Sequence, residues 1–136
     1  MKKLLTIGLV SLGLISTSTF ATDVMRLSTS KHNIQVTCYD WNNCTYRSWN
    51  KPKQIGQGKA DFEMNGNNAT GSGNWGSCPH YYFKKGNVEF ELLGMEGMAN
   101  FGRDPCIFGN VPKNAWGELT IEINGQRRDH YWLYSK

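Results

Sequence analysis

Apolar and polar residues alternate with a period of two over much of residues 22–136, and no long apolar stripe of helical period competes with this pattern. Such alternation is typical of half-buried β-strands, because successive side chains of a strand point to opposite faces of the sheet. The pattern therefore predicts an all-β fold, a small antiparallel β-sandwich or barrel of about seven to eight strands.

Residues 80–93, HYYFKKGNVEFELL, predict a hairpin whose two-residue turn is Gly86-Asn87. This turn places Lys84 opposite Glu89 and Phe83 opposite Phe90. The two faces then separate by polarity. The core face carries Tyr81, Phe83, Val88, Phe90 and Leu92, and the solvent face carries Tyr82, Lys84, Glu89 and Glu91.

Residues 116–134 predict a second hairpin around Asn124-Gly125, because both residues accept a positive φ angle. Ile123 then faces Gln126, and Glu122 faces Arg127. An unbroken register places Arg128, His130 and Trp132 on the face of Leu119, Ile121 and Ile123. Two interpretations remain open for Arg128 and His130: a β-bulge that returns both to water, or a basic spot at the rim of a groove.

Four further segments complete the predicted topology. Residues 33–38 predict a strand with Ile34, Val36 and Cys38 inward, and residues 59–64 predict one with Ala60, Phe62 and Met64 inward. Glycine and asparagine dominate residues 65–77, which predicts a turn followed by a Gly-rich strand or loop with Trp75. Residues 94–114 predict a long irregular connection, held in place by Cys106.

Residues 1–21 have the composition of a secretory signal peptide, with Lys2 and Lys3, an apolar run and small residues at Thr19 and Ala21 before the expected cleavage site. The apolar run is shorter than the roughly 20 residues that span a bilayer. We therefore expect a cleaved signal and a mature single β domain, residues 22–136, that is periplasmic or secreted and has no membrane anchor.

Four cysteines, Cys38, Cys44, Cys78 and Cys106, lie in the mature chain and form no C-x-x-C pair. In an oxidising compartment, an even number of cysteines indicates disulfides rather than a metal site. Three pairings are possible. We favour Cys38 with Cys44, which can meet across a short hairpin, and Cys78 with Cys106.

Charge and motifs restrict the function. The chain has 15 lysines and arginines against 11 acidic residues, and Lys2 and Lys3 leave with the signal, so the mature net charge is only +2. This balance disfavours a nucleic-acid partner. No zincin, nucleophile-elbow, P-loop or dinucleotide motif is present, and the three histidines are far apart in sequence. We expect neither catalytic residues nor a metal or other cofactor.

Aromatic residues make up 12% of the chain, and several lie beside Asn, Gly and Ser. Such mixtures are used in protein interfaces and in sugar recognition. In CYDWNNC, residues 38–44, a disulfide either presents Trp41 outward or lets it fold back over the open end of the barrel. The predicted binding residues are Trp41, Asn42, Asn43, Arg47, Trp49, Lys51 and Lys53, with Arg128 and His130 at the second hairpin.

In size, export and disulfide content the mature chain resembles small β-rich periplasmic inhibitors of lysozyme and periplasmic immunity proteins. It carries none of their motifs, so the resemblance transfers no residue roles. We expect a non-enzymatic protein that binds another envelope or secreted protein through the aromatic and basic edge of residues 41–53. The alternatives are a module that binds peptidoglycan or another glycan, and a small envelope hydrolase.

Overall fold

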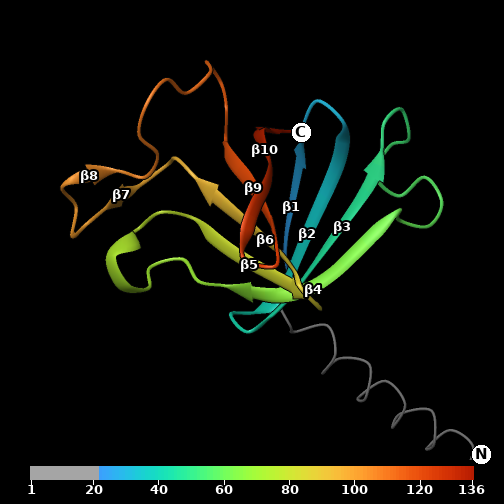
Figure 1. The fold of residues 1–136 in the computed structure, drawn as a ribbon, viewed down its shortest axis with the longest axis horizontal. Coiled ribbons are helices and arrows are strands. Elements are labelled where there is room, and N and C mark those ends of the chain that lie inside the picture. Colours follow the sequence, from blue (N-terminus) through green and yellow to red (C-terminus); the bar gives the residue numbers. More distant parts are fainter. Residues whose placement is uncertain (1–21) are drawn as a thin grey trace, which may run out of the picture.

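The computed structural model of the chain describes residues 22–136, and the predicted signal peptide lies outside the described residues. The described part is all β, as predicted: eight antiparallel strands close into a barrel, and a two-stranded sheet stands beside it (Figure 1). Of the two architectures considered, the barrel is therefore the observed one. Both favoured disulfides are present, Cys38–Cys44 and Cys78–Cys106.

Around the barrel the strand order is β1-β10-β9-β6-β5-β4-β3-β2, and the ring is continuous because β1 pairs with both β2 and β10. The barrel strands are β1 (Asp23–Ser28), β2 (His32–Asp40), β3 (Asn43–Asn50), β4 (Phe62–Asn68), β5 (His80–Lys85), β6 (Val88–Gly94), β9 (Gly117–Ile123) and β10 (Gln126–Ser135). The small sheet consists of β7 (Met98–Ala99) and β8 (Asp104–Pro105), and a single 3₁₀ turn, η1 (Gly73–Trp75), precedes β5.

The β5–β6 hairpin has the predicted register. Lys84 pairs with Glu89, and Phe83 pairs with Phe90. Inward alternation is also confirmed in β2, where Ile34, Val36 and Cys38 are buried. These strands form as expected because one face of each meets the same apolar interior.

A β-bulge interrupts the β9–β10 register between Arg127 and Asp129. Beyond it, His130 pairs with Thr120 and Trp132 pairs with Glu118, so both side chains share the outer face with Glu118. The bulge interpretation is therefore confirmed, and the unbroken register is not the observed one.

Residues 65–68 are part of strand β4 rather than a turn, which corrects the prediction for this segment. Gly66 pairs with Phe83, and a Cβ on Gly66 would lie 2.7 Å from the Phe83 Cα atom. The glycine is present because the neighbouring strand comes too close for a side chain. Trp75 lies in η1, within the loop that follows.

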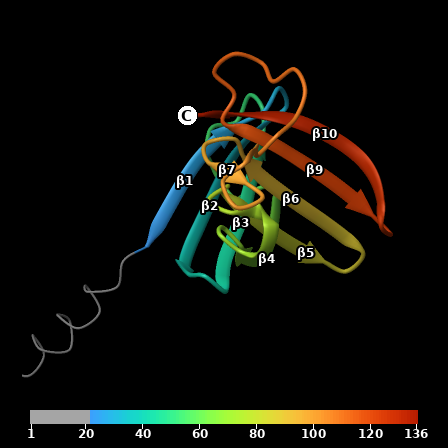
Figure 2. The same ribbon diagram turned by 90° about the vertical axis from the view of Figure 1, so that its left-hand side faces the viewer.

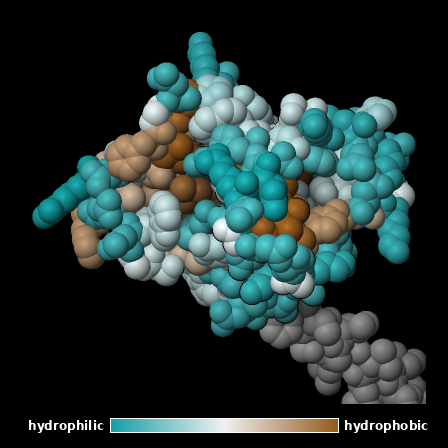
Figure 3. All heavy atoms as spheres, viewed as in Figure 1, coloured by the Kyte–Doolittle hydropathy of each residue, from teal (hydrophilic) through white to brown (hydrophobic). Residues whose placement is uncertain are grey.

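Outside the barrel wall, residues 73–79 and 94–116 form a lobe that carries β7 and β8 (Figure 1). The Cys78–Cys106 disulfide lies in its small buried cluster, together with Leu93 and Ala99. As predicted, Cys106 fixes the long connection. The surface of the lobe is partly apolar (Figure 3), with exposed side chains at Met95, Met98, Phe101 and Phe108.

The two ends of the barrel differ. The β5–β6 and β9–β10 hairpins end together on one side, at the right of Figure 2, and the β2–β3 turn lies at the lower left. The end near the β2–β3 turn contains buried Cys38 and Cys44, whereas Val88 and Ile123 at the other end, called the open end below, are only partly buried. Within residues 22–136, no helix is long and apolar enough to cross a membrane.

Candidate functional site

The turn between β2 and β3 is held by covalent and hydrogen bonds on several sides. The Cys38–Cys44 disulfide joins the two strands directly below it. The Asp40 Oδ1 atom accepts a hydrogen bond from the Asn42 backbone N–H at 2.8 Å, which is a local turn stabilised by an aspartate side chain. The Asn68 backbone N–H donates to the Trp41 carbonyl at 2.8 Å and ties the turn to β4. We call residues 39–42 the hairpin tip.

Two aromatic side chains of the hairpin tip are open to solvent. Trp41 is 60% exposed and Tyr39 is 57% exposed. Of the two arrangements left open for Trp41, the outward one is observed. Beside these side chains lies a hollow of about 200 Å³, lined by Asp23, Cys38, Tyr39, Asp40, Trp41 and Asn68.

Trp49 does not share this exposed surface, although it belongs to the predicted edge. It is only 4% exposed, and its indole N–H donates to the Gly58 carbonyl at 3.0 Å. Tyr46 and Ser48 of the same strand are buried and line the barrel interior. Because successive side chains of a strand point to opposite faces, Trp49 lies on the outer side of β3, under the loop of residues 51–61. Trp49 therefore packs this loop onto the barrel.

The basic residues of the predicted edge are also separated from Trp41. Arg47 forms an ion pair with Glu63 halfway along β3, and Lys53 pairs with Asp61 at 2.8 Å beyond its far end. The hydrogen bond from Lys53 holds the pKa of Asp61 below its usual range. Exposed Lys51 lies at that same far end, whereas Asn42 and Asn43 are exposed next to Trp41. The residues of the predicted edge therefore do not form one surface. Trp41, Asn42 and Asn43 lie at one end of β3, and Lys51 and Lys53 lie at the other.

At the second hairpin, Arg128 is exposed at the bulge. The His130 Nε2 atom lies 2.7 Å from the Glu118 Oε1 atom, and the Trp132 ring meets the His130 ring edge to face at 4.8 Å between centroids. These groups are on the outer face of the barrel, away from the hairpin tip.

A second histidine–carboxylate pair was not predicted from the sequence. His80, 2% exposed, lies under the lobe, and its Nε2 atom is 2.7 Å from the Glu91 Oε2 atom. The hydrogen bond from His80 lowers the pKa of Glu91, and burial raises that of Tyr82 to about 12. Period-two alternation assigns His80 to the solvent face, but the Trp75 ring of the preceding loop lies against it, at 4.9 Å between ring centroids.

The three histidines do not converge. His32 is at the open end of the barrel, and His80 and His130 pair with different glutamates. In the described residues 22–136, no group of three or more His, Cys, Asp or Glu side chains is arranged to hold a metal ion. The hairpin tip is therefore the place where predicted binding residues are both exposed and held in a fixed position.

Comparisons of the chain with protein-family models, with curated proteins and with solved structures find no match in any of the three.

Proposed function

We propose that the mature chain is an exported, non-enzymatic protein that binds another envelope or secreted protein through its hairpin tip. The observation that carries the proposal is the exposure of Trp41 and Tyr39 on a turn that is fixed by the Cys38–Cys44 disulfide. Tryptophan and tyrosine are enriched among the residues that dominate binding energy at protein interfaces.

The rigidity of the hairpin tip favours binding. The disulfide, the Asp40–Asn42 hydrogen bond and the bond from Asn68 to Trp41 restrict the turn before any partner arrives. A turn that is already ordered loses less conformational entropy on association than a free loop does. Trp41 can thus enter a pocket on a partner at a small entropic cost.

The charge near the hairpin tip indicates the kind of partner surface. Asp23 and Asp40 line the hollow beside Trp41, whereas Lys51 and Lys53 are at the other end of β3. The surface that the tip presents is therefore aromatic and acidic. A complementary partner has an apolar pocket flanked by lysine or arginine.

The test compares two exposed aromatic residues at separate places. Tagged wild-type protein, Trp41→Ala and Phe108→Ala are expressed in the native host, crosslinked in the envelope and purified, and the co-purified protein is then titrated with each pure variant. We expect Trp41→Ala to weaken the complex by about 2 kcal/mol or more, because it removes the central contact. Phe108→Ala, in the lobe, leaves the affinity unchanged.

Two further results decide the proposal. Replacing Cys38 and Cys44 together by alanine frees the turn, and we expect weaker binding with a faster dissociation rate. If Trp41→Ala binds the partner with wild-type affinity, the hairpin tip is not the binding site. The same conclusion follows if only Phe108→Ala loses the complex.

A glycan ligand is the second candidate, and the hollow beside the hairpin tip favours it. Tyr39 and Trp41 supply aromatic faces on which a sugar ring can stack, and Asp23, Asp40 and Asn68 supply oxygens and an amide for its hydroxyl groups. Purified muropeptides should then shift the NMR signal of the Trp41 indole N–H in the absence of any protein partner. Unshifted spectra at millimolar muropeptide eliminate this candidate.

A further inference from the structure

The open end of the barrel contains an apolar cavity of about 330 Å³. This volume is at the lower end of the range of small-molecule sites, roughly 300–1,000 Å³. One wall of the cavity is apolar and is formed by β6 and β9. The rest of the lining includes four polar residues. The lining residues are Val88, Phe90, Leu119, Ile121 and Ile123, then Tyr46 and Phe62, and finally His32, Ser48, Asn50 and Asp61.

The cavity follows from the different filling of the two ends of the barrel. Away from the open end, Leu92 is fully buried in the core. Toward the open end, Phe62, Val88 and Ile121 pack against that core and are only partly buried. Eight strands enclose an interior that side chains can fill or that can hold one small ligand. Here side chains fill the interior around Leu92 and leave apolar walls open around Val88 and Ile121.

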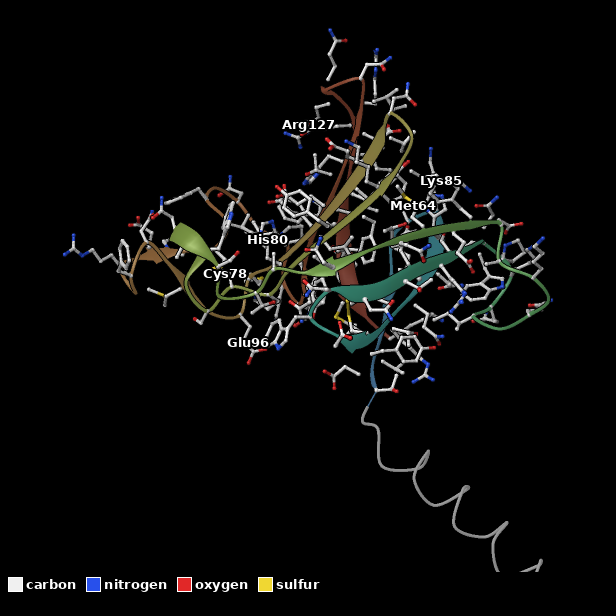
Figure 4. The ribbon with its side chains drawn as sticks, turned by 90° about the horizontal axis from the view of Figure 1, so that it is seen from below. Met64, Cys78, His80, Lys85, Glu96 and Arg127 are labelled. Carbon is white, nitrogen blue, oxygen red and sulfur yellow. A yellow bond between two sulfur atoms is a disulfide. The ribbon has the colours of Figure 1, made fainter. Side chains whose placement is uncertain are left out.

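A cation stands at the rim of this cavity. Lys85 is the last residue of β5 (Figure 4). The residue before it, Lys84, pairs with Asn65 of β4. The Lys85 Nζ atom lies 5.8 Å from the centroid of the Phe62 ring, which lines this cavity. Phe62 also lines an adjoining hollow, which Lys85 shares with Arg47 and Glu63. Among residues 22–136, Lys85 forms no ion pair with a carboxylate, whereas Lys84 pairs outward with Glu89.

Asp61 and His32, two side chains that can carry a charge near pH 7, line the same cavity. The Asp61 carboxylate accepts hydrogen bonds from Lys53 Nζ at 2.8 Å and from the Asn50 backbone N–H at 2.7 Å. Burial is the largest cause that lowers the pKa of His32, which favours the neutral imidazole at pH 7. Lys85 has no carboxylate partner among the described residues and is therefore a cation that a ligand's carboxylate can meet on the Phe62 side of the cavity. Lys31 and Lys51 are the cations on the His32 side, where their charges also lower the pKa of His32.

We propose that the open end of the barrel binds a small amphipathic anion, whose apolar chain or ring fills the cavity and whose carboxylate pairs with Lys85. The apolar walls select a hydrocarbon body, and the volume limits its length. The rim cation selects the anionic head over a neutral or cationic one. This site is separate from the hairpin tip, which lies at the opposite end of β3.

Calorimetric titration of the oxidised mature protein tests the ligand class. The probes are hexanoate, octanoate and decanoate, with octan-1-ol and octyltrimethylammonium as neutral and cationic comparators. We expect about a threefold to fourfold gain in affinity per added methylene until the cavity is full. Octanoate should bind about two to five times more tightly than octan-1-ol, and octyltrimethylammonium more weakly than both.

Matched variants test the residues. Lys85→Gln should remove the preference for octanoate over octan-1-ol, and Lys84→Gln, one residue away and pointing outward, should keep it. Ile121→Trp fills the cavity and should abolish binding of both probes. Because a large side chain can also unfold the barrel, NOEs between octanoate and the methyl groups of Ile121 and Val88 in the wild-type protein provide an independent readout.

Several outcomes overturn the proposal. Octanoate binding that persists in folded Ile121→Trp, or NOEs confined to the methionine methyl groups of the lobe, places the ligand elsewhere. Equal loss of preference in Lys84→Gln and Lys85→Gln removes the specific role of Lys85. Absence of binding at millimolar octanoate and decanoate removes the ligand class. None of these results depends on the partner of the hairpin tip.

Discussion

Gly66 of β4 lies directly opposite Phe83 of β5, so close that a Cβ atom on Gly66 would be 1.8 Å from the Tyr82 carbonyl oxygen. The two strands can pair at this point only because residue 66 has no side chain. This contact also keeps the Phe83 ring in the core, where it packs against the Tyr46 ring at 5.6 Å between centroids.

Replacing Gly66 by alanine should therefore lower the free energy of unfolding by about 2 kcal/mol or more, because β4 and β5 must separate to admit the methyl group. Chemical denaturation of the oxidised protein measures this effect. Asn67→Ala, at the exposed neighbouring position of β4, is the control and should change stability by less than about 0.5 kcal/mol. A fully stable Gly66→Ala variant would show that the strands can shift apart freely.

Glu91 should make stability depend on pH on the acid side. Its pKa is lower in the folded protein than the ordinary value of 4.5, chiefly because of the hydrogen bond from His80. The ionised carboxylate therefore stabilises the fold above that ordinary value, and this contribution is lost as the pH falls through the lower, folded pKa. Hydrogen bonds to charged groups contribute roughly 1.5–3 kcal/mol, and partial exposure of Glu91 places this one at the lower end.

Denaturation between pH 3 and pH 7 measures the Glu91 effect. Glu91→Gln should be less stable than wild type at pH 7, and the difference should shrink toward pH 3. Glu89→Gln, two residues away on the same face, removes only the 3.6 Å pair with Lys84. We expect it to follow the wild-type curve. If the free energy of unfolding depends on pH in the same way for Glu91→Gln and wild type, Glu91 is not the group responsible.

The two disulfides should contribute unequally. Cys78 and Cys106 are separated by 28 residues and Cys38 and Cys44 by six. On the chain-entropy account, the longer loop stabilises by about 3.5 kcal/mol and the shorter by about 2 kcal/mol. Double alanine variants of each pair, compared by urea denaturation, measure the difference. A larger loss from the short loop would indicate that local contacts at the hairpin tip outweigh loop entropy.

Phe101 adopts a left-handed backbone conformation, with φ 59°, in the turn between β7 and β8. Its ring is 84% exposed, so burial does not compensate this backbone conformation. Phe101→Gly should increase the free energy of unfolding by about 0.5–1 kcal/mol and so raise the melting temperature. Phe108→Gly, exposed without a positive φ angle, should give no gain. Equal gains in both variants would exclude backbone relief as the cause.

The sequence was sufficient where local signals determine structure. The Gly86-Asn87 turn and the alternation around it predict the β5–β6 register, because a one-residue shift would expose Phe83 and Phe90. The bulge at Arg128 was one of two interpretations that the sequence left open, and the cost of pointing a guanidinium and an imidazole inward explains why it is the observed one. The favoured disulfide pairing was also correct.

Long-range contacts were not predictable from the sequence. Composition predicts a turn at Gly66, whereas the glycine is required by pairing with Phe83, 17 residues further along the chain. The sequence pattern predicts Trp49 as an interface residue, whereas the loop that follows it in the chain covers it. The apolar cavity depends on how far core side chains fill a closed barrel, and single-strand patterns do not contain that information.

The ring of strands closes between the first and last ones, where only Leu27 with Ser135 and Ser28 with Tyr134 are paired. A chain that emerges N-terminus first must therefore hold β1 without its second neighbour until residue 135 arrives. Throughout that interval β1 has an unpaired edge, which is a template for pairing with other chains. The last few residues, Tyr134 to Lys136, thus determine how long each new molecule is open to aggregation, and a C-terminal truncation should act first on folding yield.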